Sequence, residues 1–343
     1  MSCPLPSDGR DRITLAHGSG GRLTRRLVEE IFAPAFHNAL LAPLCDAAVW
    51  TEHAGRLAFT TDAYVVSPLV FPGGDIGHLA VCGTVNDLAM MGARPKHLSA
   101  AFVLEEGLPL AVLKDLVRSM AACARDAGVA IVTGDTKVVE RGKGDGLYVT
   151  TAGVGVCATA TPLGPSMIAD GDVVIVNGDL GRHGMAIMAH RAGLEFDEPL
   201  LSDVACLHEP VLALIEAGIP LHCLRDLTRG GLATAVVELA QASARGVVVD
   251  GKSIAVSRPV AAACDLLGLD PLYVANEGRF VACVPASAAD AALAVLHAHP
   301  LAREARVVGR VGGVTPGWAV LETPYGTRQK LDLLSGDQLP RIC

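Results

Sequence analysis

The chain has 343 residues and a formal net charge of −8, and 51% of its residues are hydrophobic while only 4% are aromatic. A net negative chain without a cluster of Lys and Arg argues against a nucleic-acid partner, because backbone phosphates require a basic face. The sequence has no apolar run of about 18 residues and no charged-then-apolar segment at its N-terminus. We therefore expect no membrane partner and a cytoplasmic protein.

Strand-like runs and helical periodicities alternate along the chain, which predicts an α+β fold. Strands are expected at 56–61, 98–104, 129–133, 147–156, 172–177, 246–249 and 280–284, and helices at 20–37, 76–91, 109–127, 203–217, 231–244 and 286–297. The length suits two domains. Prolines within 159–170 interrupt both periodicities, so this stretch is the expected boundary between the domains.

The cysteines give little sign of a metal site. The chain has ten of them, and most stand in apolar neighbourhoods, where buried thiols behave as small hydrophobic side chains. No Cys-x-x-Cys pair occurs, and no Cys and His residues have the spacing of a zinc module. The sequence therefore predicts no structural metal site.

Acidic side chains end four of the apolar runs. They are Asp62, Asp135, Asp179 and Asp226, and Asp87 follows Asn86 inside the predicted helix 76–91. Each one alone is an ordinary turn or cap residue. Carboxylates at strand ends can converge over one cleft, however, where Mg²⁺ would bridge them to phosphate oxygens. Together they favour a magnesium-phosphate site.

Glycine-rich loops stand beside these acids and open predicted helices at Gly18-Ser19-Gly20-Gly21 and at Thr228-Arg229-Gly230-Gly231. Such loops let backbone N–H groups approach an anion at a helix N-terminus. The alternative is an ordinary loop in which Ser19 caps the following helix. No P-loop motif occurs, so an ATP site would need a different fold.

The chain ends on a cysteine, Cys343, which follows the polar, turn-rich stretch 322–338. Some 20 extended residues reach about 60 Å, so this thiol could travel between two active sites. Pro340 would stiffen the approach, and Arg341 would place a cation near a thiol whose neighbouring carboxylate otherwise raises its pKa. The alternative is a frayed chain end without a function.

Motifs along nearly the whole chain, from about 17 to 343, resemble those of the HypE family, the carbamoyl dehydratases of nickel-iron hydrogenase maturation. The matching residues are His17-Gly18-Ser19-Gly20-Gly21, Phe59-Thr60-Thr61-Asp62, Phe71-Pro72-Gly73-Gly74, Cys82-Gly83-Thr84-Val85-Asn86-Asp87, Leu104-Glu105-Glu106-Gly107-Leu108-Pro109, Thr133-Gly134-Asp135-Thr136-Lys137-Val138-Val139, Asp226-x-Thr228-Arg229-Gly230-Gly231, Ala275-Asn276-Glu277-Gly278 and Pro340-Arg341-Ile342-Cys343. Only Asp75 stands where the family pattern leads us to expect Asn.

The resemblance implies a two-domain PurM-like (AIR synthetase-like) fold with a flexible C-terminal tail. The expected parts are an N-terminal segment 1–40, a domain 41–158 with the ATP site and the interface of a homodimer, a second domain 159–321, and a mobile tail 322–343. A HypF-type carbamoyltransferase would load the terminal thiol. ATP would drive dehydration of the S-carbamoyl group to thiocyanate, and the cyanide would pass to iron on a HypC–HypD complex.

The resemblance also implies roles for individual residues. Cys343 would carry the carbamoyl group, Lys137 would contact the transferred phosphoryl group, and Glu277 would act as the base. Mg²⁺ would be held by Asp62, Asp87, Asp135 and Asp226. ATP would contact Gly18, Ser19, Gly20, Gly21, Asn86, Asp135, Thr136, Thr228, Arg229 and Gly230. Without the resemblance, Lys137 is as readily a solvated loop lysine and Glu277 a turn residue. How the two residues divide the roles of base, phosphate contact and orientation of the amide is open.

Two other functions remain open from the sequence. One is another ATP-dependent enzyme of the same fold, such as a selenophosphate synthetase, for which Cys3 is the candidate reactive thiol. The other is a nucleotide-binding scaffold without activity, whose tail docks on a partner while Cys343 only packs. Removal of the last residue would distinguish the two, because a scaffold would keep its partner binding and any ATPase activity would not depend on the tail.

Overall fold

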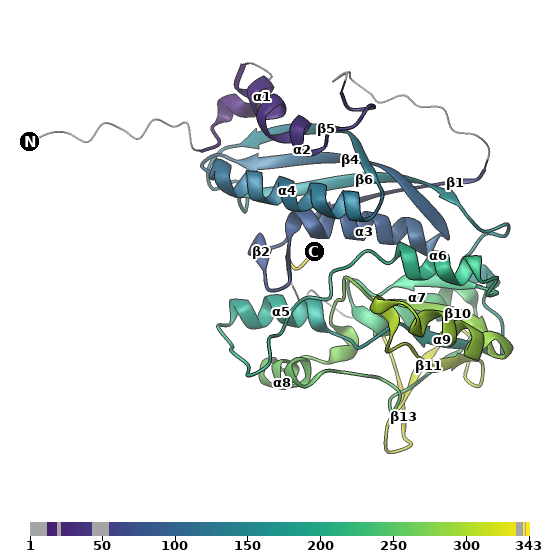
Figure 1. The fold of residues 1–343 in the computed structure, drawn as a ribbon. Coiled ribbons are helices and arrows are strands. Elements are labelled where there is room, and N and C mark those ends of the chain that lie inside the picture. The colour runs from purple at the N-terminus through teal and green to yellow at the C-terminus, as the bar shows by residue number, and fades with distance from the viewer. Residues whose placement is uncertain (1–11, 19–21, 43–54, 334–338, 340) are drawn as a thin grey trace, which may run out of the picture.

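The computed structural model describes residues 12–18, 22–42, 55–333, 339 and 341–343. These residues form two halves, one built on a four-stranded sheet and the other on a seven-stranded sheet. Figure 1 shows the N-terminal half above the C-terminal half, with the end of the chain between them. This two-domain α+β arrangement is the one predicted from the sequence.

The four-stranded sheet has the order β1 (Leu57–Tyr64), β6 (Leu147–Cys157), β4 (Ala93–Glu105), β5 (Ala130–Val139). Strands β4 and β5 run parallel and the other pairs are antiparallel. Helices α3 (Ile76–Met90) and α4 (Leu110–Asp126) pack on one face. A short hairpin, β2 (Val70–Phe71) and β3 (Gly74–Asp75), leads into α3, whose N-terminus is capped by Asp75.

Helix α4 forms where the sequence places apolar side chains at helical spacing. Leu113, Leu116, Val117 and Met120 are buried on one face, and Gly128, with φ of +67°, ends the helix. Beside it lie α1 (Arg22–Leu27), a π-helical turn (Val28–Phe32) and α2 (Ala33–Ala35). Phe32 of this segment stacks on Phe102 of β4 with ring centroids 4.8 Å apart. The predicted single helix 20–37 is therefore three shorter pieces where it is described.

The other face of the four-stranded sheet exposes apolar side chains. Strand residues alternate between faces, so Phe59 of β1 and its partner Val154 of β6 point away from α3. Phe59 is 72% exposed and Leu57 is 58% exposed. We call this surface the open face. Large exposed apolar surfaces of this kind usually mark an interaction site.

The seven-stranded sheet builds the C-terminal half. Its order is β13 (Arg328–Lys330), β12 (Ala319–Glu322), β9 (Val247–Asp250), β11 (Arg306–Val311), β7 (Asp172–Val176), β10 (Phe280–Pro285), β8 (Cys223–Asp226). Only the pair β12–β9 is parallel. Side chains of α7 (Gly231–Ser243) join one hydrophobic cluster with this sheet, and those of α6 (His208–Glu216) and α9 (Ala289–His297) join another. Helices α5 (Arg182–Arg191) and α8 (Arg258–Leu267) contact each other.

The sequence located most of these elements, with three corrections. The helix expected at 203–217 begins only at His208, because Asn86 of the other half binds the backbone of 205–207. The tail expected from 322 onwards begins later, since β13 pairs with β12 and Leu331 is buried. Helices α5 and α8 and the short strands β2, β3, β8, β11, β12 and β13 were not predicted.

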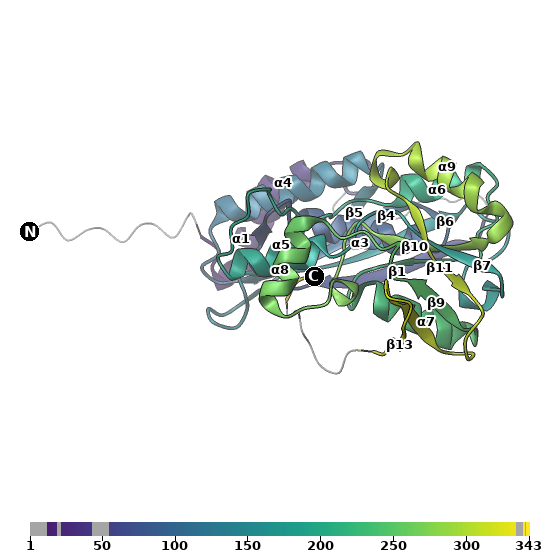
Figure 2. The same ribbon diagram turned by 90° about the horizontal axis from the view of Figure 1, so that it is seen from below.

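The end of the chain returns to the N-terminal half. Ile342 and Cys343 are buried in the same hydrophobic cluster as residues of α3 and α4. Figure 2 shows this chain end beside α5 and α8 when the molecule is seen from below. The last residues therefore lie at the junction of the two halves.

Candidate active site

Cys343 occupies the centre of the candidate site and is only 8% exposed. Arg229 holds it at both ends: the guanidinium Nε donates to Cys343 Sγ at 3.1 Å, and Nη2 donates to the Cys343 carbonyl oxygen at 2.8 Å. Arg229 stands in the loop between β8 and α7, where a Cβ on Gly231 would lie 2.5 Å from Leu272 O. The glycine thus lets the loop pack closely and aim the arginine at the thiol.

Backbone contacts dock the preceding residues. His183, in the first turn of α5, has Nε2 2.7 Å from Ile342 O and Nδ1 2.8 Å from Ser202 Oγ. Arg191, in the last turn, donates to Ser67 O at 2.6 Å and also to Arg341 O. No role was predicted for these two α5 residues, because their partners lie far away along the chain.

The predicted role of Arg341 is wrong. Its guanidinium donates to Asp145 Oδ2 at 2.8 Å and is largely exposed, so Arg229 is the cation that contacts the thiol. Burial, followed by the nearby charge of Glu277, raises the pKa of Cys343 to about 12, although Arg229 opposes the shift. The docked thiol is therefore neutral near pH 7. Pro340 lies outside the described residues.

Glu277 lies beside this thiol and is buried. Its backbone N–H and that of Gly278 donate to the two carboxylate oxygens of Asp203, at 3.1 and 3.3 Å. A Cβ on Gly278 would stand 1.9 Å from Asp203 O, so only glycine allows the two segments to approach this closely. Neither Asp203 nor this contact was predicted, and no local sequence signal points to them.

One oxygen of the Glu277 carboxyl group is available to accept a hydrogen bond. Among the described residues, its Oε1 has no hydrogen-bond partner. Burial, and then the charges of Asp226 and Asp203, raise its pKa well above the usual range, while Arg229 opposes the shift. A buried carboxyl group with raised proton affinity and an unpaired oxygen is suited to accept a proton from a neighbouring group.

Three of the predicted metal-binding carboxylates gather near Glu277. Asp62 comes from β1, Asp87 from α3 and Asp226 from the end of β8. Burial first and the charge of Asp87 second raise the pKa of Asp226 to about 6. Burial also raises the pKa of Asp87, although Thr60 Oγ1 donates to it at 2.7 Å. Carboxylates that repel one another in this way, drawn from three segments, form an oxygen-only donor set that fits Mg²⁺.

Asn86 precedes Asp87 on α3 and joins the two halves. Its Oδ1 accepts from Leu207 N at 2.7 Å, and its Nδ2 donates to Ala205 O at 3.0 Å. The backbone N–H of Ala205 in turn donates to Glu277 O at 3.2 Å. Asn86 thus fixes the segment that positions Glu277, and we call residues 203–207 the strap.

Asp135 and Lys137 lie elsewhere in the structure. Ala63 of β1, Thr150, Ala101 and Asp135 stand opposite one another across the sheet. Asp135 therefore shares the open face, whereas Asp62 points to the face that α3 covers. Three strand spacings also separate β1 from β5, about 14 Å. One chain does not bring Asp135 and Lys137 to the other three aspartates.

The residues on β5 form a second, exposed group. Lys137 Nζ lies 2.9 Å from Asp135 Oδ2, and this lysine lowers the pKa of Asp135. Gly18 packs against the same strand, since a Cβ there would stand 2.7 Å from Val138 N. Ser19, Gly20 and Gly21 lie outside the described residues. We call Gly18, Asp135, Thr136 and Lys137 the β5 group.

The remaining predicted nucleotide contacts adjoin Cys343. Thr228 and Gly230 flank Arg229 in the loop between β8 and α7. Gly230 has φ of +75°, and a Cβ there would stand 2.1 Å from Thr234 Oγ1. We call this loop, with Cys343, Glu277 and the three aspartates, the tail site. The predicted residues are therefore divided between the tail site and the β5 group.

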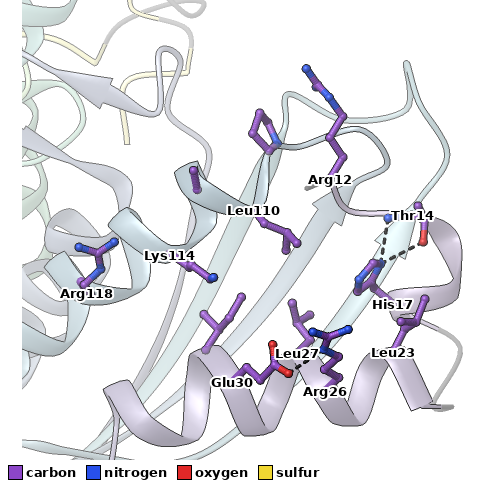
Figure 3. A pocket seen from close by; sticks show the side chains of 13 residues that line it. Arg12, Thr14, His17, Leu23, Arg26, Leu27, Glu30, Leu110, Lys114 and Arg118 are labelled. Carbon is purple, nitrogen blue, oxygen red and sulfur yellow. Dashed lines mark hydrogen bonds and ion pairs between the residues drawn. The ribbon is translucent and has the colours of Figure 1, made fainter. Parts of the chain in front are cut away.

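A cavity of about 860 Å³ borders neither the tail site nor the β5 group directly. Figure 3 shows it between the N-terminal helical segment and α4, with Arg12, Arg26, Glu30, Lys114 and Arg118 among the side chains that line it. Arg26 is paired with Glu30 at 2.6 Å. A smaller cavity, of about 220 Å³, is lined by Asp135 and Thr136 of the β5 group together with Phe32 and Phe102.

Within the described ranges, none of the helices has the length and apolar character needed to cross a lipid bilayer. Only this finding bears on the expectation of no membrane partner.

Comparisons with known proteins agree with the fold. Residues 45–157 match the N-terminal domain of AIR synthase related proteins, and residues 169–317 match their C-terminal domain. The carbamoyl dehydratase HypE of Cupriavidus necator is 51% identical over 333 residues, which cover 97% of this chain and 95% of that protein.

Solved structures give the same picture. A crystal structure of the hydrogenase maturation protein HypE in complex with ATP has a TM-score of 0.92 and 45% identity, covering 96% of this chain and 99% of that one. A HypE chain from a HypE–HypF complex has a TM-score of 0.78 and 42% identity, covering 90% and 99%. With two AIR synthase related domains and full-length relatives at about half identity, this chain belongs to the HypE family of carbamoyl dehydratases.

Proposed function

We propose that this chain uses ATP to dehydrate a carbamoyl group carried on the Cys343 sulfur, forming a thiocyanate whose cyanide becomes a ligand of iron in a nickel-iron hydrogenase. The observation that carries the proposal is the buried Cys343 thiol, held by Arg229 beside a glutamate with an unpaired oxygen. A relative whose structure holds ATP supports the choice of nucleotide.

The chemistry must remove an oxygen that is a poor leaving group. The γ-phosphoryl group passes to the carbamoyl oxygen, and the bond from the γ-phosphorus to the bridging oxygen of ADP breaks. The carbon–oxygen bond then breaks, so that the oxygen leaves in phosphate. Both N–H protons are lost, and sulfur is left bonded to a C≡N group. ATP, a thiocarbamate and no added oxidant give ADP, phosphate and a thiocyanate.

Glu277 suits the removal of the N–H protons. A carbamoyl group on Cys343 Sγ would extend from the thiol toward Glu277, whose Oε1 has no hydrogen-bond partner among the described residues. A general base contributes most when its proton affinity is close to that of the medium, and burial raises the pKa of Glu277 in this direction. Arg229 would hold the sulfur and the terminal carboxylate while the proton moves.

The nucleotide is proposed to lie between two copies of the chain. Thr228, Arg229 and Gly230 of the tail site and the neighbouring Asn86 would come from one copy. The other copy would supply Gly18, Asp135 and Thr136 of its β5 group, together with Ser19, Gly20 and Gly21. Lys137 would accompany them toward the transferred phosphoryl group. Mg²⁺, when bound by Asp62, Asp87, Asp226 and the other copy's Asp135, would neutralise phosphate charge.

The open face supports the proposed homodimer. It exposes Phe59 and Leu57 on the edge strand β1, and it carries Asp135 and Lys137 on β5. Pairing two such faces would bury the apolar side chains and move each β5 group toward the partner's tail site. This arrangement accounts for catalytic candidates that one chain keeps apart.

Loading and unloading require other proteins. Cys343 is too buried to meet a second enzyme in place, so the tail must leave its pocket to accept a carbamoyl group. We propose a HypF-type carbamoyltransferase as the donor, since a relative forms a HypE–HypF complex. A HypC–HypD complex is proposed to receive the cyanide on iron.

The test is the intact mass of the protein with a carbamoylating HypF-type partner, followed by Mg-ATP. We expect a gain of one carbamoyl group and then the loss of one water, both on the C-terminal peptide. Cys343→Ala should bind ATP but acquire no carbamoyl group, which also excludes the scaffold alternative. Loss of water without ATP would contradict the mechanism, and modification of Cys343→Ala on the same peptide would contradict the site.

A further inference from the structure

Four side chains of the types that bind metals, three thiols and one imidazole, meet beside the tail site but take no part in the proposed reaction. His78 and Cys82 lie on α3, Cys123 on α4, and Cys206 on the strap. His78 and Cys82 are four residues apart, so they share one face of their helix. That face packs against α4, which brings Cys123 to the same point.

The distances between the three sulfurs are short and even. Cys82 Sγ lies 3.6 Å from Cys123 Sγ and 3.3 Å from Cys206 Sγ, and Cys123 Sγ lies 3.8 Å from Cys206 Sγ. A ring nitrogen of His78 is within 4.8 Å of the sulfurs of Cys82 and Cys123. Ligands at about 2.3 Å from a tetrahedral zinc ion stand about 3.8 Å from one another. The three sulfurs therefore already have nearly the spacing of three corners of such a site.

We propose that His78, Cys82, Cys123 and Cys206 bind one Zn²⁺ ion in a tetrahedral Cys₃His site. Three thiols and one imidazole are a donor set that Zn²⁺ prefers, whereas Mg²⁺ takes oxygen ligands. Each thiol would lose its proton on binding, while the imidazole binds in its neutral form. Cys82 and Cys123 are buried, and Cys206 is half-buried, so the ion would enter from the side of the strap.

A metal ion accounts for the cluster better than a disulfide does. A disulfide would join two of the sulfurs and leave the third thiol and His78 unused. The zinc ion would use all four side chains and would join α3 and α4 of one half to the strap. Because Ala205 of the strap contacts the Glu277 backbone, the site would also hold this part of the tail site in place.

The sequence alone argued against a structural metal because it offers no zinc-module spacing. The four side chains come from three segments that meet only in the folded protein, so no short motif records them. This is the expected situation for ligands on helices and a loop of two packed domains.

The test begins with the full-length protein purified under reducing conditions. Its zinc content is measured by elemental mass spectrometry. The metal-free protein is then titrated with Co²⁺, which absorbs strongly when bound by thiolates. We expect about one metal ion per chain and a thiolate–cobalt charge-transfer band. Cys206→Ser should weaken Co²⁺ binding by about tenfold or more, since even outer-shell changes cost that much.

Cys157→Ser is the matched control, because Cys157 is a half-buried free thiol outside the cluster, and it should bind Co²⁺ like the unchanged chain. His78→Gln gives a second variant with a less buried side chain if Cys206→Ser folds poorly. Absence of the charge-transfer band in the reduced chain would overturn the proposal. Equal Co²⁺ affinity of the two cluster variants and the control, or a disulfide within the cluster of the protein as isolated, would do the same.

Discussion

The tail site and the β5 group contrast in how the protein treats charge. Glu277 is only 3% exposed, and burial raises its pKa and those of Asp87 and Asp226. The side chains of Asp135 and Lys137 are 62% and 65% exposed and form an ordinary ion pair, a kind that contributes less than about 1 kcal/mol to stability. Proton affinity is raised in the buried region, whereas Lys137 lowers that of Asp135, so we expect proton transfer in the buried region. We propose that the exposed group acts only when a second copy of the chain covers it.

Replacing the proposed base should separate the two regions most strongly. Glu277→Gln keeps the size of the side chain but removes its ability to accept a proton, so we expect dehydration to slow by about 10²–10⁴-fold. Carbamoylated Cys343 should accumulate, which intact mass spectrometry measures. Loading by the HypF-type donor should remain, and a variant that dehydrates at the normal rate would exclude Glu277 as the base.

Mixing two inactive proteins should reveal whether the regions act across subunits. We expect Lys137→Ala and Glu277→Gln homodimers to be nearly inactive alone. After exchange of subunits, each mixed dimer would combine an intact tail site of one copy with an intact β5 group of the other. Random exchange should then restore activity to about a quarter of the sites. No gain on mixing, with exchange confirmed by labelled subunits, would place both residues in one chain's site.

Loosening the docked tail should have a smaller effect. His183→Ala removes the hydrogen bond to Ile342 O, and the loss of about 1 kcal/mol should expose the terminal thiol about fivefold more often. The rate at which iodoacetamide modifies Cys343 at fixed pH measures this exposure. Asp145→Ala is the matched control, since it removes only the exposed contact with the Arg341 side chain, and its labelling rate should change little.

The sequence predicted features that depend on local patterns or on motifs. Helix α4 followed from its apolar periodicity, Asp62 and Asp226 from the ends of apolar runs, and Asp87 from its place after Asn86. The role of Glu277 came from the family resemblance. These four lie together with Cys343, but no pattern in the sequence states that they do, because their segments meet only after the halves pack. The roles of the individual residues remain predictions.

The features that the sequence missed depend on long-range packing. Helix α5 has buried residues on most sides, so it lacks the amphipathic pattern that marks a surface helix. For the same reason its His183, which holds the tail, gave no signal. The Arg341 guanidinium binds Asp145 and not the neighbouring thiol. Because Asp145 is far from Arg341 along the chain, this ion pair could not be predicted from adjacent residues. A chain end that folds back into the core is likewise invisible to local rules.

A change of pH should have the smallest effect, through His183 and its hydrogen bond to Ile342 O. Burial lowers the pKa of His183 below its usual value of 6.5, so as the pH falls below about 6.5 the unfolded chain takes up the proton before the folded chain does. Above this pH the histidine leaves the free energy of unfolding unchanged. Below it the histidine lowers the free energy of unfolding, by at most about 1.4 kcal/mol per pH unit.

His183→Gln should make thermal unfolding less dependent on pH between about 7.5 and 5.5. His208 supplies the control, because burial also lowers its pKa. His208→Gln should make the melting temperature less dependent on pH while leaving the labelling of Cys343 unchanged. If His183→Gln left both the pH dependence and the labelling as they were, the histidine would not be holding the tail.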